Sequence, residues 1–135
     1  DFMSKLSAFL HPVTEKKEKE VVISDRFQDE KGNPIPFKIR SLSQEENESL
    51  MKKARRVRKT GQEEFNSTEY MRYLVVAATV EPDFSSKEVC DHFGVIDPSL
   101  VPGKMLMSGE YSLLVQEITK LSGFNQDDIE GLAKN

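Results

Sequence analysis

Residues 70–80 read Tyr70-Met71-Arg72-Tyr73-Leu74-Val75-Val76-Ala77-Ala78-Thr79-Val80, and only Arg72 and Thr79 interrupt their apolar character. A helix that is apolar around nearly its whole circumference must be covered by other elements of the fold. The stretch is too short to span a bilayer, which needs about 20 apolar residues. We therefore predict a central helix over residues 65–80, with the rest of one small domain packed against it.

The composition of the whole chain is that of one globular domain. It has 135 residues, of which 37% are hydrophobic and 31% are charged, and a chain of this length can bury a core without disulfide bonds. The single cysteine, Cys90, cannot form an internal disulfide, which favours a reducing cytoplasm as the compartment. We recognise no signal peptide, and no segment is long and apolar enough to cross a membrane.

The first forty residues predict a flexible segment followed by a β-hairpin. Residues 1–20 combine a short amphipathic piece with a run of alternating charges, which indicates a solvated, flexible N-terminal segment. Strands are predicted at 21–27 and 35–40, because turn-forming residues at 29–34 separate them. The second strand alternates apolar and polar residues, so its Ile35-Phe37-Ile39 face must rest on helices.

The remaining residues, 43–133, predict helices within a single domain that covers residues 21–135. A capping box from Ser43 to Glu46 starts a helix that we expect to continue to Gly61. Its predicted apolar stripe consists of Leu50, Met51, Ala54 and Val57. Further helices are predicted at 85–94, 98–103, 108–122 and from Asn125 onward. The fold class is therefore mainly α (α+β), with an N-terminal β-hairpin packed on a small bundle of about five or six helices.

The residue types that carry catalysis or bind metals are not grouped in this sequence. The two histidines, His11 and His92, lie in different segments, and Cys90 and His92 would point to different faces of a helix. The glycines are scattered, so no phosphate-binding loop can be recognised. We therefore predict no metal site, no cofactor and no enzymatic activity.

The charge is spread unevenly along the chain. Residues 1–80 carry 15 Lys/Arg against 13 Asp/Glu, and residues 81–135 carry 4 against 10. An acidic second half disfavours a general nucleic-acid binder. The basic run 52–59 holds six Lys/Arg, which could form a phosphate-binding or acidic-partner patch. The simpler interpretation, which we favour, is the solvated end of a helix whose dipole these cations complement.

Two groups of apolar residues are candidate partner-binding surfaces. Leu6, Phe9 and Leu10 have helical spacing and would need a groove to lie in. The second group consists of Met105, Leu106 and Met107. Flexible methionine side chains suit adaptable binding surfaces, and they equally suit gaps in a core, which is the slightly favoured interpretation here.

The order of several segments resembles a known family. These segments are Leu6-Ser7-Ala8-Phe9-Leu10-His11-Pro12-Val13, Ser24-Asp25-Arg26-Phe27, residues 29–40, Glu81-Pro82-Asp83-Phe84, His92-Phe93-Gly94-Val95, residues 104–111 and Ser122-Gly123-Phe124. Together they resemble the XkdN-like tail assembly chaperones of tailed bacteriophages and PBSX-type prophages. The resemblance extends from Leu6 to Phe124, although Ser108 stands where the family usually has a proline before Gly-Glu-Tyr.

The resemblance implies a non-enzymatic chaperone that works in the cytoplasm of the bacterial host and is absent from the mature virion. Such proteins are thought to keep the tape-measure protein soluble until tail-tube subunits polymerise around it. The implied partners are the tape-measure protein and the tail-tube subunits. Independently of the resemblance, a mobile N-terminal segment could dock on such a partner or on a second copy of the chain, which would give a homo-oligomer. Two alternatives stay open: a small nucleic-acid-associated regulator that uses the basic run 52–59, and a minor structural tail component.

Overall fold

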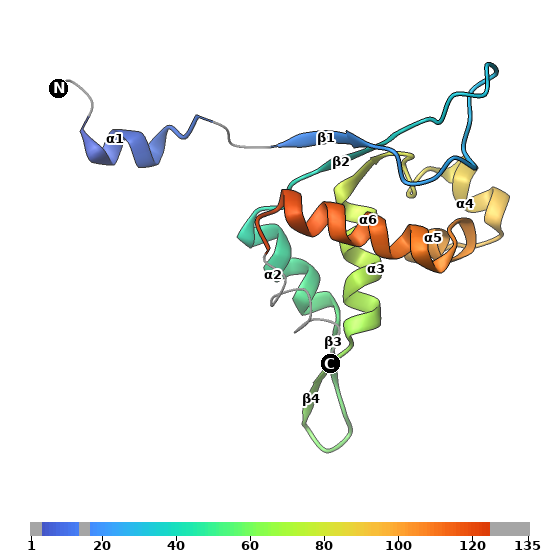
Figure 1. Cartoon of the computed structure of the whole chain (residues 1–135). Coiled ribbons are helices and arrows are strands. Elements are labelled where there is room, and N and C mark those ends of the chain that lie inside the picture. The colour runs from blue at the N-terminus through green and yellow to red at the C-terminus, as the bar shows by residue number, and fades with distance from the viewer. Residues whose placement is uncertain (1–3, 14–16, 125–135) are drawn as a thin grey trace.

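The apolar stretch forms helix α3 (Ser67–Ala78), which lies at the centre of the fold in this computed structural model (Figure 1). The structure describes residues 4–13 and 17–124. The helix begins where Asn66 accepts a hydrogen bond from the Glu69 N–H at 3.0 Å, which is the usual N-cap interaction. Its buried side chains are those of Tyr70, Leu74, Val75 and Ala78.

The end of the apolar stretch is a strand and not a helix. Residues Thr79–Glu81 form β5, whereas we predicted that the helix continues to Val80. A proline disfavours helical geometry at the residue before it, and Pro82 directly follows Glu81. Thr79 and Val80 are also β-branched, which suits an extended backbone. The prediction of a longer helix was therefore wrong at its C-terminal end.

Three strands form an antiparallel sheet in the order β1-β2-β5. Strand β1 (Glu18–Val21) pairs with β2 (Phe37–Arg40), which confirms a hairpin near the N-terminus. The first strand starts at Glu18, before the predicted range 21–27, and it overlaps that range only at Val21. Strand β1 is an edge strand, and charged residues are common on edges that meet solvent. Its charged residues 18–20 were therefore misread as part of the flexible segment 1–20.

The connection between β1 and β2 contains the predicted turn. The Asp29 carboxylate accepts hydrogen bonds from the N–H groups of Lys31 and Asn33, both at 2.9 Å, and Gly32 has a φ of +83°. The predicted buried face is confirmed at Phe37 and Ile39 only. Ile35 precedes the strand and remains 49% exposed.

Helix α2 (Gln44–Lys53) is followed by a second hairpin that the sequence analysis missed. The capping box of Ser43 and Glu46 is confirmed, but the helix ends at Lys53 and not near Gly61. Strands β3 (Arg55–Val57) and β4 (Glu63–Phe65) pair antiparallel. Arg58 and Glu64 form an ion pair at 2.9 Å beside this ladder. Opposite charges on facing strands stabilise a hairpin. Val57 lies in strand β3, so it is exposed and not part of the predicted helical stripe.

The second half of the chain is helical, largely as predicted. It contains α4 (Lys87–Phe93), the short 3₁₀ helix η1 (Pro98–Leu100), α5 (Val101–Met105) and α6 (Ser108–Leu121). Gly94 ends α4 with a φ of +67°, as a helix-terminating glycine should. The N-cap of α6 is Met107, whereas Ser108 was expected to cap it. The final helix predicted from Asn125 lies outside the described residues.

The core lies where α3, α6 and the sheet meet. Helix α6 contacts α3 and strands β1 and β2, and its Leu114, Val115 and Ile118 are buried (Figure 1). Helix α1 (Lys5–Leu10) stands apart from these elements in Figure 1. No helix among residues 4–13 and 17–124 reaches the length and hydrophobicity that spanning a bilayer would require.

Candidate partner-binding site

The segment Met105-Leu106-Met107 joins α5 to α6 and lies between two hollows of the surface. Met105 is half-buried and lines the first hollow, while Leu106 lines the second hollow and is only 9% exposed. Met107 is 61% exposed. The three residues of this candidate surface therefore differ in role: Leu106 belongs mainly to the core, and the methionines on either side of it are accessible.

The first hollow, which we name the apolar pocket, has a volume of about 260 Å³. Pockets for small molecules usually have about 300–1,000 Å³, so this one suits a side chain of a docked polypeptide. Glu81 is its one charged residue. The full lining consists of Phe27, Ile35, Pro36, Phe37, Glu81, Pro82 and Met105, which come from four separate parts of the chain.

Arg26 holds the rim of the apolar pocket in place. Its guanidinium group lies 5.0 Å from the centroid of the Phe27 ring, and Phe27 packs against Phe37 with ring centroids 5.7 Å apart. The same guanidinium donates hydrogen bonds to Glu110 at 2.6 and 2.9 Å and to the Met105 carbonyl oxygen at 3.1 Å. One side chain thus connects the two walls of the pocket.

Glu110 completes this clamp at the start of α6. Besides its bonds to Arg26, its carboxylate accepts a hydrogen bond from the Met107 N–H at 2.7 Å, which explains why Met107 and not Ser108 is the N-cap residue. The Arg26 hydrogen bonds, with those from Ser24 and the Met107 backbone, lower the pKa of Glu110 to about 2. The carboxylate is therefore ionised across the physiological range.

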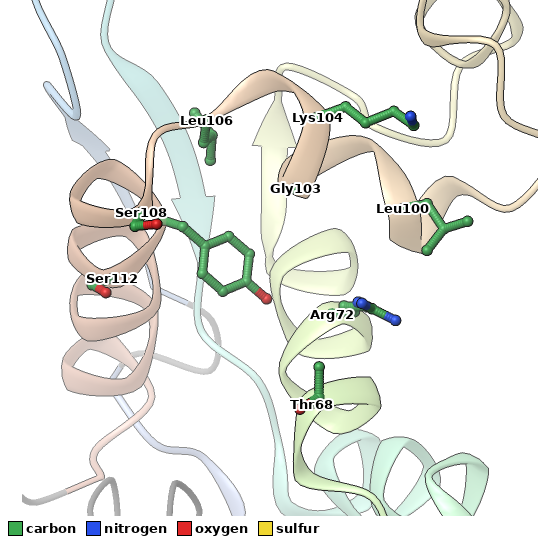
Figure 2. A pocket seen from close by; sticks show the side chains of 9 residues that line it. Thr68, Arg72, Leu100, Gly103, Lys104, Leu106, Ser108 and Ser112 are labelled. Carbon is green, nitrogen blue, oxygen red and sulfur yellow. The ribbon is translucent and has the colours of Figure 1, made fainter.

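The second hollow, which we name the cationic pocket, has a volume of about 560 Å³ and is shown in Figure 2. Arg72 on α3 and Lys104 on α5 are its charged residues. Burial raises the pKa of the Tyr111 phenol, and the positive charge of Arg72 acts against that shift. The lining consists of Thr68, Arg72, Leu100, Gly103, Lys104, Leu106, Ser108, Tyr111 and Ser112.

Helix α1 carries the other candidate surface, and its apolar side chains point into solvent. Leu6, Phe9 and Leu10 are 65%, 81% and 62% exposed. The helix begins where the Ser4 hydroxyl accepts a hydrogen bond from the Ser7 N–H at 3.1 Å. Six residues are too few for a stable isolated helix. This arm, residues 4–13, is thus suited to docking on another surface.

Half of the cations in the basic run 52–59 interact with neighbouring side chains of the same chain. Arg58 pairs with Glu64 at 2.9 Å and Arg56 pairs with Glu69, while Lys53 lies 4.4 Å from the centroid of the Tyr73 ring. These ion pairs raise the pKa values of Arg56 and Arg58. Half of the six cations are therefore occupied by neighbouring side chains, which weakens the case for a phosphate-binding patch.

Several residues of the apolar pocket were missed in the sequence analysis. Phe27 was assigned to a strand, Ile35 to a buried strand face, and Pro82 was noted only within the segment Glu81-Pro82-Asp83-Phe84. One signal in the sequence could have indicated the pocket residues, namely the apolar pair Ile35-Pro36 beside a turn. Because a proline cannot donate a hydrogen bond to a neighbouring strand, it favours a strand that begins after it. Within residues 4–13 and 17–124, no group of three or more His, Cys, Asp or Glu side chains could hold a metal ion.

Comparison with known proteins shows the family to which this chain belongs. The family described as phage XkdN-like tail assembly chaperone protein matches residues 6–133. The uncharacterised protein YqbN and the phage-like element PBSX protein XkdN, both of Bacillus subtilis (strain 168), are each 33% identical over 138 aligned residues, which cover 96% of this chain and 93% of theirs. The crystal structure of YqbN has a TM-score of 0.75 and 29% identity, covering 87% of this chain and 96% of that one.

Proposed function

This chain belongs to the family of phage XkdN-like tail assembly chaperones, and we propose that it acts by binding the tape-measure protein during tail morphogenesis. The interaction is reversible and involves no covalent chemistry. We further propose that the chain works in the cytoplasm of the bacterial host, as a single domain that begins at strand β1, and that it leaves before the virion is mature.

The observation that carries this proposal is the apolar pocket with its clamped rim. An apolar polypeptide is kept soluble when its side chains enter grooves on a polar carrier. The apolar pocket offers Met105 and Ile35 at an accessible surface, and the polar remainder of the chain keeps the complex in solution. Phe9 of the arm supplies a second apolar contact that can adapt to the partner.

Co-expression with the tape-measure protein from the same genome tests the proposal. We expect the tape-measure protein to become soluble and to co-purify with this chain. The variants Met105→Gln and Ile35→Gln should each reduce the amount that co-purifies, because they place an amide where an apolar side chain of the partner would lie. Phe9→Gln should reduce it as well.

The controls use apolar residues that are exposed elsewhere on the molecule. Ile96 is 100% exposed and Val57 is 71% exposed, and neither lines the apolar pocket, so Ile96→Gln and Val57→Gln should leave co-purification unchanged. Thermal melting of every variant separates lost binding from lost folding. A tape-measure protein that stays insoluble beside a folded, soluble wild-type chain would rule the function out. Docking of the arm on a second copy would instead appear as a Phe9-dependent dimer without the partner.

A further inference from the structure

The cationic pocket contains two positive charges that no carboxylate of the described residues neutralises. The ion pairs formed among residues 4–13 and 17–124 involve other cations and not Arg72 or Lys104. In Figure 2, both side chains extend toward the same side of the pocket, with Leu100 between them. Arg72 comes from α3 and Lys104 from α5, so packing of the helices places both cations at one hollow.

The lining of this pocket carries positive charge and no negative charge. Lys104, Ser108 and Ser112 come from residues 81–135, which hold four Lys/Arg against ten Asp/Glu, yet Glu and Asp are absent from the lining. A guanidinium group can bind a carboxylate through two parallel hydrogen bonds, and an ammonium group adds a point charge. The hydroxyls of Thr68, Ser108 and Ser112 provide further donors around the same hollow.

The walls of the pocket restrict the kind of anion that fits. Leu100 is 39% exposed and Leu106 is largely buried, and together with the ring of Tyr111 they present apolar surface beside the cations. A polyanion such as nucleic acid requires many phosphate contacts for affinity, and only two cations are available in a chain of net charge −4. A single carboxylate next to an apolar side chain matches both features.

We propose that the cationic pocket binds the carboxylate of an aspartate or glutamate that is flanked by an apolar residue in the partner polypeptide. The proposal deepens the proposed function and rests on it for the identity of that partner. The apolar pocket and the cationic pocket lie on either side of residues 105–107, so one partner segment reaches both. The cationic pocket then selects which apolar segments are bound.

A matched pair of ligands tests the site without the tape-measure protein. The probes are doubly capped leucyl-glutamate and its leucyl-glutamine counterpart, each titrated into the full ¹⁵N-labelled chain. We expect saturable shifts at the amides of Gly103, Lys104 and Ser112. The glutamate probe should bind about tenfold or more tightly than the glutamine probe, because hydrogen bonds to charged groups are the stronger ones.

The variants identify the residues responsible. Arg72→Gln/Lys104→Gln should remove the difference between the two probes, and Lys104→Gln alone, at an exposed position, should reduce it severalfold even if the double variant folds poorly. Lys120→Gln is the control, since Lys120 is an exposed lysine of α6 outside the pocket, and it should keep the full difference.

Three results would overturn the site. They are equal affinity for the two probes, shifts elsewhere than around the pocket, and no saturable shift at all. Binding of a short oligothymidylate that is lost in the double variant would reassign the pocket to nucleic-acid phosphates and likewise overturn it. Discrimination between the probes without co-purification of the tape-measure protein would refute the proposed function and keep the site. Co-purification of the tape-measure protein without discrimination between the probes would support the proposed function and refute the site.

Discussion

The arm and the apolar pocket both present apolar side chains to solvent, but only the pocket is held in place by neighbouring groups. Arg26 connects Phe27, Glu110 and the Met105 carbonyl oxygen around the pocket. In the arm, the side chains of Leu6, Phe9 and Leu10 are all more than half exposed. The difference indicates two kinds of contact: a preformed one that costs little ordering entropy on binding, and an adaptable one that orders when a partner arrives.

The same difference has a consequence for stability. Residues of the helical body contribute their buried area to folding, whereas exposed residues of the arm contribute almost none. Substitutions in the two regions should therefore separate folding from binding.

Leu114→Ala should destabilise the protein strongly, and Phe9→Ala should not. Leu114 on α6 is fully buried in the core, so its truncation leaves a cavity and lowers the free energy of unfolding by about 2–5 kcal/mol. Phe9 is 81% exposed, and its truncation should change that free energy by less than about 0.5 kcal/mol. Urea denaturation followed by circular dichroism measures both. Similar losses from the two variants would show that the arm is part of the folded core.

Tyr70→Phe should have the next largest effect, because it breaks a buried polar pair in the body. The Tyr70 hydroxyl donates a hydrogen bond to the Asn47 side-chain oxygen and so connects α3 to α2. Removing one partner of a buried pair leaves the other unsatisfied and costs about 1–3 kcal/mol of unfolding free energy. Adding Asn47→Leu to Tyr70→Phe should recover part of the loss. A further loss of similar size would mean that the two side chains act independently.

The parts of the fold that could be predicted from the sequence are those decided by local chemistry. Ser43 with Glu46 specified a capping box, Gly94 a helix end, and the apolar run around Leu74 a buried helix. Where a distant partner decides the structure, prediction failed. Arg55–Val57 is a strand because Glu63–Phe65 returns beside it, and Thr79–Glu81 is a strand because β2 offers a free edge.

The candidate site shows the same limit. The sequence left open whether Met105 and Met107 form a binding surface or fill gaps in the core, and it slightly favoured the core. It could not place Phe27 or Pro82 beside Met105, since these residues are far apart in the chain. Arg26 and Glu110 are 84 positions apart, so no local pattern could indicate that they form the clamp. Only the packing of α6 against the sheet brings them together.

Glu110→Gln should lower stability by less than the core substitutions do, and this loss should be present at neutral pH and disappear in acid. Hydrogen bonds from Arg26 lower the pKa of Glu110 from its usual 4.5 to about 2. A carboxyl whose pKa is lower in the folded state stabilises the fold above pH 4.5, and that contribution is lost as the pH falls toward 2. The variant lacks this contribution, so its acid unfolding curve should be flatter between these values.

Glu46→Gln is the matched comparison for this last test. Hydrogen bonds from Arg40 and the Ser43 backbone lower the pKa of Glu46 to about 2 as well, but Glu46 lies at the start of α2 and outside the apolar pocket. Both variants should therefore show a flatter dependence of stability on pH in the acid range, measured by circular dichroism from pH 2 to pH 7. Only Glu110→Gln should also reduce co-purification of the tape-measure protein at neutral pH, because it releases one end of the clamp. Equal capture by the two variants would show that a preformed rim is not needed and that the pocket, like the arm, adapts to its partner.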